Sequence, residues 1–292
     1  MIDDIRVRKQ QLQRDEFERR VRDGLKPSPL VEHKDLGEIA GEENLQRVSR
    51  IEELNQVTES IVRGKSLLFH TPSKRLLWQA FGHEYIEPDL LNFIDQIPSD
   101  ETYFDIGASN GIFALYAAAT GKKVICFEPE VANFALLNYN SYLNAFKNRH
   151  AITNFNVALS DKTGLGNIFI EKFEPGGHLK ILDAPIKRGE KIFTPDYKQA
   201  VLKYSLDDFI ALFDIEVPNY IKIDVDGYEQ EVLMGMNKVL NSNKIKKIFI
   251  ELEEGGNNFI KCKNILADHG FSIESKQRVQ NYFGEENYIF SK

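Results

Sequence analysis

The sequence predicts an α/β fold built on a seven-stranded, mostly parallel, doubly wound sheet with helices on both faces, preceded by an α-helical amino-terminal appendage. Residues 103–128 run through an apolar strand, a glycine-containing turn, an apolar helix and a second strand. Strand-like and helix-like segments keep alternating up to residue 290. Residues 1–63, by contrast, are rich in Arg, Glu and Gln and poor in aromatic residues. The sheet is therefore expected to begin after this amino-terminal part.

The composition is typical of a globular protein and excludes several classes. The 292 residues are 42% hydrophobic and 28% charged, with a formal net charge of −7. An acidic chain lacks the broad basic surface that nucleic acid requires, so we expect no nucleic-acid partner. No apolar signal segment or run of about 18 apolar residues occurs, which predicts no membrane span. Only Cys126 and Cys262 are present, which excludes a disulfide framework and a zinc site and predicts a cytoplasmic protein.

Residues 1–64 are predicted to form a helical appendage to a second unit, residues 65–292. A partly frayed helix is expected over residues 6–26, ended by Pro27 and Pro29. An apolar stripe then recurs every three or four residues and predicts a helix of about five turns. The stripe consists of Leu45, Val48, Ile51, Leu54, Val57 and Ile61. It is expected to pack on the chain's own surface, to form a homodimer or to cover the substrate.

The turn at residues 107–111 has the features of a nucleotide-type cofactor site. Small residues stand where the backbone must pass close to a ligand, and Asp105 precedes them. Glu128 ends the next strand, at about the 20-residue offset of an acid that binds ribose hydroxyls. The dinucleotide fingerprint is absent, because Ser109 and Ile112 replace its second glycine and its small residue. Asp105 would also repel a phosphate, so we expect S-adenosylmethionine, which has none.

Four separated motifs resemble, in order, those of the FkbM-type S-adenosylmethionine-dependent methyltransferases. They are FDIGASNG, FEPE, VALSD and YIKIDVDGYEQEVLMG, and the resemblance extends over about residues 84–254. It implies a Rossmann-like class I methyltransferase fold that methylates a hydroxyl on a sugar, glycan or secondary metabolite. The chain departs from the family at Asp226, where family members commonly have Glu.

The cofactor contacts are expected at the carboxyl ends of the strands and in the loop before the first strand. A helical entry segment is predicted over residues 67–97, with Pro88 at the start of its second helix. The loop between its two helices, residues 81–87, resembles the family's segment that approaches the methyl donor. The third strand, residues 152–159, would bring adenine contacts, although Asp161 also suits a turn cap. The predicted cofactor residues are Glu84, Asp105, Gly107, Ala108, Asn110, Gly111, Glu128, Pro129, Asn156, Val157, Asp161 and Asp224.

Catalysis is expected near acids that end the fourth and fifth strands, residues 220–225 and 245–252. Strand alternation places Asp224 toward the sulfonium, the donor's amino group or the acceptor hydroxyl. Either Glu251 or His83 would remove the acceptor proton. The acids could instead hold Mg²⁺, whose ligands are oxygens, but we expect metal-free methyl transfer and no metal ligand. The Asp-Gly pair that begins with Asp226 also suits a helix cap.

Residues 164–204 are predicted to be an insertion that sets the specificity for the acceptor. It contains Gly176 and Gly177 before His178, and a basic run with Lys187 and Arg188 that is expected to be solvated. The chain then closes with a helix over residues 259–269 and an antiparallel hairpin over residues 271–275 and 288–290.

The sequence therefore predicts an O-methyltransferase with a small-molecule or glycan acceptor. Two alternatives remain from the same residues. An NAD-dependent oxidoreductase would use Glu128 on its ribose and would bind pyridine nucleotide. A catalytically silent adapter would keep the fold and recruit a partner through its amino-terminal helix.

Overall fold

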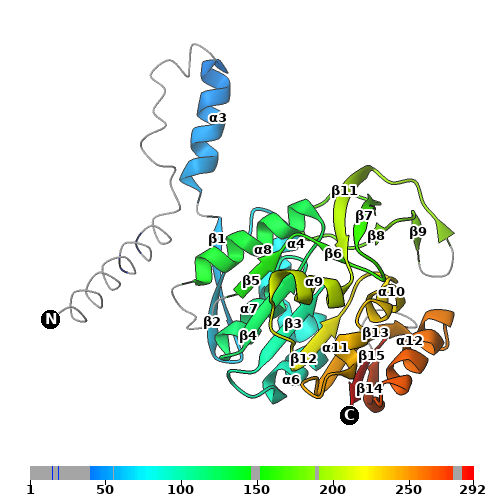
Figure 1. The fold of residues 1–292 in the computed structure, drawn as a ribbon. Helices are drawn as coiled ribbons and strands as arrows, with labels where there is room; N and C mark the ends of the chain where they lie inside the picture. The colour runs from blue at the N-terminus through cyan, green and yellow to red at the C-terminus, as the bar shows by residue number, and fades with distance from the viewer. Residues whose placement is uncertain are drawn as a thin grey trace.

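The structure is a computed structural model (Figure 1). It describes Asp15, Arg19 and residues 40–54, 56–145, 152–187, 191–278 and 285–292. The helix predicted over residues 6–26 lies outside the described residues apart from Asp15 and Arg19, and so does Arg188 of the predicted basic run.

A seven-stranded mixed sheet forms the centre of the fold (Figure 1). Its strands are β3 (Thr102–Ile106), β4 (Lys123–Phe127), β5 (Ile152–Phe155), β12 (Tyr220–Ile223), β13 (Lys247–Glu253), β14 (Ser272–Arg278) and β15 (Glu285–Ser291). Their order is β14-β15-β13-β12-β3-β4-β5. The pairs from β13 to β5 are parallel, whereas β15 runs antiparallel to β13 and β14. The predicted α/β fold with its seven-stranded sheet and closing hairpin is confirmed.

Strand β3 is apolar on both faces because helices cover both. Tyr103 packs in one apolar cluster, while Phe104 and Ile106 pack in another on the opposite face. The first cluster includes side chains from α6 (Pro88–Gln96), α7 (Ile112–Ala119) and α8 (Val131–Asn144). The second includes side chains from α9 (Leu206–Phe213), α10 (Glu229–Met234), α11 (Asn237–Asn241) and α12 (Asn257–Asp268). The sheet is therefore packed between two layers of helices, and the carboxyl ends of its parallel strands lie along one edge.

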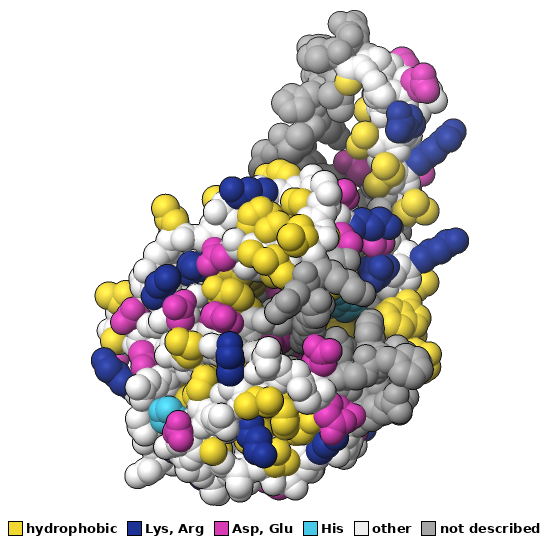
Figure 2. All heavy atoms as spheres, turned by 90° about the vertical axis from the view of Figure 1, so that its right-hand side faces the viewer, with side chains coloured by type: hydrophobic (Ala, Val, Ile, Leu, Met, Phe, Trp, Pro, Cys, Tyr) yellow, Lys and Arg dark blue, Asp and Glu magenta, His cyan; other side chains and the backbone are white. Residues whose placement is uncertain are grey.

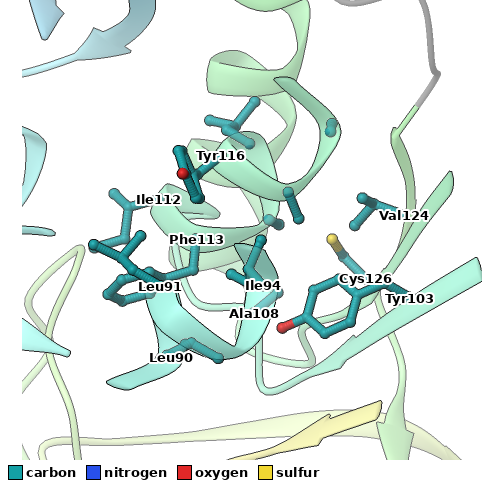
Figure 3. Close-up of a cluster of buried hydrophobic side chains, with 14 of the residues drawn as sticks. Leu90, Leu91, Ile94, Tyr103, Ala108, Ile112, Phe113, Tyr116, Val124 and Cys126 are labelled. Atoms are coloured by element: carbon teal, nitrogen blue, oxygen red, sulfur yellow. The ribbon is translucent and has the colours of Figure 1, made fainter. Parts of the chain in front are cut away.

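Helix α7 is buried around nearly its whole circumference, and Figure 3 shows Ile112 and Phe113 beside Leu91 of α6. The residue before it, Gly111, has a φ of 83°, and a Cβ there would lie 2.4 Å from the Leu137 side chain. Glycine is thus required for α7 to begin so close to α8. The turn between β3 and α7 is therefore packed directly against α8.

The amino-terminal helix is shorter than predicted. Helix α3 covers Glu42–Glu53, and the chain then forms a hairpin of β1 (Val57–Val62) and β2 (Lys65–His70). The predicted continuation of the helix through Ile61 is wrong, because the β-branched residues of this stretch favour a strand. Positive φ angles at Arg63 and Gly64 supply the hairpin turn. The change in composition near residue 65 therefore falls within this hairpin, and the division into two units remains a prediction.

The entry segment begins as a strand and not as a helix. Leu67 and Leu68 belong to β2, and α4 (Lys74–Phe81), α5 (His83–Ile86) and α6 follow. Pro88 occupies the first turn of α6, as predicted. The Asn144 side chain of α8 accepts from the Leu68 N–H at 3.0 Å and donates to the Leu68 carbonyl at 2.7 Å. Because these bonds use the free edge of β2, the hairpin is fixed to the core.

The predicted insertion forms most of a second sheet. Its strands are β6 (Ala158–Leu159), β7 (Gly164–Ile170), β8 (Lys180–Leu182) and β11 (Tyr197–Tyr204), in the order β6-β11-β7-β8, and β9 (Ile186–Lys187) pairs separately with β10 (Lys191–Ile192). The third strand predicted over residues 152–159 is thus two strands, β5 and β6, in different sheets. None of the helices in the described part of the chain has the length and apolar character of a membrane-spanning helix.

Candidate active site

An open cleft lies where the carboxyl ends of β3, β4 and β12 meet the second sheet. The second sheet supplies an apolar wall, including Ile168 and Leu182. Five of the residues predicted from the sequence line this cleft: Gly107, Glu128, Pro129, Val157 and Asp224. Four separate parts of the chain therefore converge here, as expected for the carboxyl edge of a parallel sheet.

The turn after β3 is packed so tightly that it accepts no side chain at its first position. Gly107 has a φ of 81°, and a Cβ there would lie 1.9 Å from the carbonyl oxygen of Asp224. The N–H groups of Gly107 and Ala108 donate to the carbonyl of Phe127 at 2.9 and 3.2 Å. The backbone of this turn is thus fixed against both neighbouring strands. A ligand in the cleft would contact the backbone of this turn directly, because no side chain lies between them.

Glu128 lies at the rim of the cleft with its carboxylate oriented by backbone groups. Its Oε2 accepts from the Ser109 N–H at 2.8 Å, and its Oε1 accepts from the Glu130 N–H at 2.9 Å. Burial raises the pKa of Glu128 to about 7, although these bonds and the charge of Lys180 act in the opposite direction. Each carboxylate oxygen still has a lone pair for another donor, so two ligand hydroxyls could bind.

A buried lysine joins two carboxylates beneath the cleft. Lys222 Nζ lies 3.1 Å from Asp105 Oδ1 and 3.4 Å from Asp224 Oδ2, and it donates to the Gly107 carbonyl at 2.8 Å. Burial alone would lower the pKa of Lys222, but Asp105, Asp224 and Glu87 raise it above its ordinary value. Asp105 is buried below the cleft, whereas the Asp224 side chain keeps 31% of its exposure and faces the cleft. Lys222 thereby fixes Asp224 next to the turn.

Glu87 was not singled out from the sequence, although it belongs to this charged group. It is buried, and its pKa is raised to about 8 by burial and by the charge of Asp224. Burial also raises the pKa of Asp105, while the charge of Lys222 acts in the opposite direction. Three carboxyl groups, those of Glu87, Asp105 and Asp224, therefore surround the single ammonium of Lys222.

His83 and Glu84 do not line the cleft. His83 is buried between the rings of Phe69 and Phe113, and its Nε2 lies 3.2 Å from the Ile112 carbonyl. Burial lowers the pKa of His83 to about 4. The Glu84 side chain is 57% exposed and forms an ion pair with Arg63 at 2.7 Å. Their predicted roles as a base and as a donor contact remain predictions that this geometry does not favour.

Several other predicted residues support the walls of the cleft without lining it. Asn110 Nδ2 donates to the Gln79 side chain at 2.9 Å. Asn156 Nδ2 donates to the carbonyls of Glu128 and Pro129 at 2.9 and 3.0 Å, which orients the loop after β4. Asp161 accepts from the Ser160 hydroxyl at 2.9 Å, and Ala108 and Gly111 pack against apolar side chains. Contact between these residues and a ligand remains a prediction.

Glu251 lies on β13 opposite Asn287 of β15 and is not part of the cleft lining. Its role as a base remains a prediction. Across the described ranges, no group of three or more His, Cys, Asp or Glu side chains is arranged to hold a metal ion. Asp226, which the sequence suggested as a helix cap, instead accepts from the N–H groups of Leu179 and Lys180.

The structure adds cleft residues that were not predicted as cofactor or catalytic residues. His178 and Lys180 of the insertion line the cleft together with Asn133 and with Tyr228 of the fourth motif. The glycine pair before His178 was the only signal for this part of the site. Lys180 Nζ lies 2.5 Å from Glu130 Oε2, and both side chains are almost fully buried. Because Glu130 also caps α8, this ion pair connects the insertion to the start of α8.

Family membership follows from the same part of the chain. Residues 105–286, more than half of the sequence, match the Methyltransferase FkbM domain. The chain belongs to the FkbM methyltransferase family. The resemblance of the four motifs is therefore confirmed, and the matched range of this FkbM domain includes Gly107, Glu128, Asp224 and the insertion.

Two relatives of this FkbM methyltransferase cover similar parts of the chain. The hexuronic acid methyltransferase AglP of Haloferax volcanii is 24% identical over 195 residues, which is 66% of this chain and 73% of the relative. Methyltransferase 1 of Beauveria bassiana is 25% identical over 209 residues, 66% of this chain and 81% of the relative. A solved FkbM methyltransferase from Methylobacillus flagellatus matches with a TM-score of 0.47 and 15% identity, covering 67% of this chain and 45% of that protein.

Proposed function

We propose that this FkbM methyltransferase uses S-adenosylmethionine to methylate a hydroxyl on a sugar, glycan or secondary metabolite. The observation that carries the proposal is the carboxylate of Glu128, held by the N–H groups of Ser109 and Glu130 at the rim of the cleft. Its remaining lone pairs suit the two ribose hydroxyls of an adenosyl group. Family membership supports a methyl donor over the pyridine nucleotide of an oxidoreductase.

The rest of the donor has matching partners along the cleft. Val157, Ala158 and Ile168 offer apolar surface to the adenine ring. Gly107 leaves the backbone of the turn exposed to close approach, and Asp224 offers a carboxylate to the donor's ammonium. When bound, the donor supplies a methyl group on a positively charged sulfur. The Asp224 carboxylate, which keeps part of its exposure to the cleft, favours a cation of this kind.

The acceptor is assigned to the side of the cleft formed by the insertion. His178 and Tyr228 supply a ring nitrogen and a hydroxyl there, which are groups that a polyhydroxylated molecule can use. One relative is named a hexuronic acid methyltransferase, which supports a sugar as the acceptor class. Methyl transfer to oxygen gains most from holding the reacting groups in line, and Asp224 is the predicted catalytic carboxylate within reach of the cleft. We propose that no metal takes part.

Two further predictions about assembly belong to this proposal. The apolar side chains of α3 are exposed, with 48% for Val48, 55% for Ile51 and 64% for Leu54. Figure 2 shows hydrophobic side chains at the surface of this protruding part of the molecule. A homodimer through α3 would cover them. The face in Figure 2 also carries basic and acidic side chains interspersed, which supports the prediction that nucleic acid is not a partner.

A transfer assay tests the proposal. The protein is incubated with methyl-labelled S-adenosylmethionine and a panel of hexoses, hexuronic acids and their glycosides, with and without added Mg²⁺. We expect labelled product for at least one sugar, with a rate that chelation of divalent cations leaves unchanged. Labelled product that forms only on a nucleic acid or only with Mg²⁺ would contradict the proposal. Donor binding without transfer to any acceptor would favour the silent adapter.

A further inference from the structure

One segment of the insertion, residues 174–180, lies along the cleft and is attached on both sides. We call it the strap. Gly177, His178 and Lys180 of the strap line the cleft. The strap leads from β7 into β8, which are neighbouring strands of the second sheet.

The first half of the strap is held by the helices next to the glycine turn. The Gly176 N–H donates to Asn133 Oδ1 at 2.8 Å, and Gln79 Nε2 donates to the Gly176 carbonyl at 2.9 Å. Gly176 has a φ of 76°, and a Cβ there would lie 2.7 Å from side-chain atoms of Gln79 and Leu76. Gln79 also accepts from Asn110 of the turn. The position of this half of the strap is therefore fixed by α4 and α8.

The second half is held by the Asp226 carboxylate and by the edge of β7, where Lys180 pairs with Ile170 and the Glu171 N–H donates to the Leu179 carbonyl at 3.4 Å. Asp226 Oδ2 accepts from the Leu179 N–H at 3.0 Å and from the Lys180 N–H at 3.3 Å. Leu179 has a φ of 61°, in the left-handed region that is unfavourable for a bulky residue, whereas Asp226, with a φ of 53°, is of a residue type that adopts this region more readily. The Lys180 side chain reaches back to Glu130 at the start of α8. Asp226 thus fixes an otherwise unfavourable backbone conformation.

We propose that Asp226 is a positioning residue that holds the strap, and with it His178 and Lys180, across the cleft. The inference rests on the proposed function only for the identity of the ligand. Both N–H groups meet the same oxygen, so this role needs a hydrogen-bond acceptor and does not need a negative charge. A carboxylate that bound the donor's cation or removed a proton would need the charge. Asp226→Asn and Asp226→Ala separate these two roles, because the Asn carbonyl can accept the same two bonds.

The strap itself is tested by amide hydrogen exchange on the full-length protein without ligand. Loss of two hydrogen bonds should raise the exchange rates of Leu179 and Lys180 about tenfold in Asp226→Ala. The rates in Asp226→Asn should stay within about threefold of the wild type. Asp208→Ala, which removes an exposed carboxylate outside the cleft, is the matched control and should leave both rates unchanged. Unchanged exchange in Asp226→Ala would overturn the proposal.

Donor-site kinetics provide the second measurement, with S-adenosylhomocysteine as the probe. A loosened strap should release it about tenfold faster from Asp226→Ala, while Asp226→Asn should keep the wild-type release rate and its dependence on pH. An Asp226→Asn variant as defective as Asp226→Ala would show that the charge is needed and would overturn the positioning role. If the wild type binds no S-adenosylhomocysteine, the proposed function fails, and the exchange rates still decide the role of Asp226.

Discussion

Replacing Glu128 with Gln removes the ionisable carboxyl group of this side chain and keeps its size. Burial raises the pKa of Glu128 to about 7 from an ordinary value of 4.5. The folded protein therefore binds this proton more tightly than the unfolded chain, so the stability that the group contributes is complete below about pH 4.5 and is lost as the pH rises through about 7. The gap between the two values corresponds to about 3 kcal/mol.

Urea unfolding of the wild type and Glu128→Gln at about pH 5 and about pH 8 measures this effect. We expect the free energy of unfolding of the wild type to fall, relative to the variant, by about 2–3 kcal/mol between the two pH values. Groups that both proteins share, including Glu87, cancel in this comparison. Glu101→Gln is the control, because Glu101 forms its ion pair with Lys246 at the opposite end of the sheet. A wild-type-to-variant difference that does not change with pH would refute the burial of Glu128 as described.

Two other substitutions test the floor of the cleft. Gly107→Ala should lower the free energy of unfolding by about 3 kcal/mol or more and abolish donor binding, because its Cβ would meet the Asp224 carbonyl. Gly255→Ala has a similar φ with no atom within 4 Å, so urea unfolding should show only about 1 kcal/mol of loss there. Lys222→Met should cost about 3–5 kcal/mol in the same assay, with partial recovery at lower pH as the unpaired carboxyls bind protons.

Local patterns predicted the sheet and the glycine turn because each depends on neighbouring residues. The apolar run ending at Asp105 and the small residues after it were enough to place β3 and the turn. The stretch from Val57 to Val62 misled the same reasoning, since its apolar spacing fits a helix whereas its β-branched residues and the following Gly64 form a hairpin. Short apolar runs leave this ambiguity, which pairing with another strand resolves.

Long-range contacts explain what the sequence could not provide at the site. Asp226 binds Leu179 across 47 residues of chain, whereas its neighbours in the sequence suggested a helix cap or a metal ligand. Glu87, directly before α6, interacts electrostatically with Lys222 of β12, which is distant from it in the sequence. His83 was predicted, as an alternative to Glu251, to be the base, but in the structure it lies in α5 with its ring between Phe69 and Phe113. Such placements depend on packing and not on spacing.

Donor binding at Glu128 is the central claim, and titration calorimetry tests it most directly. S-adenosylmethionine, S-adenosylhomocysteine and NAD are titrated into the wild type, Glu128→Ala and the control Glu101→Ala. We predict that the two adenosyl ligands bind the wild type and Glu101→Ala, that Glu128→Ala abolishes this binding, and that NAD does not bind. Binding of NAD in place of the methyl donor, or donor binding that Glu128→Ala leaves intact, would contradict the account.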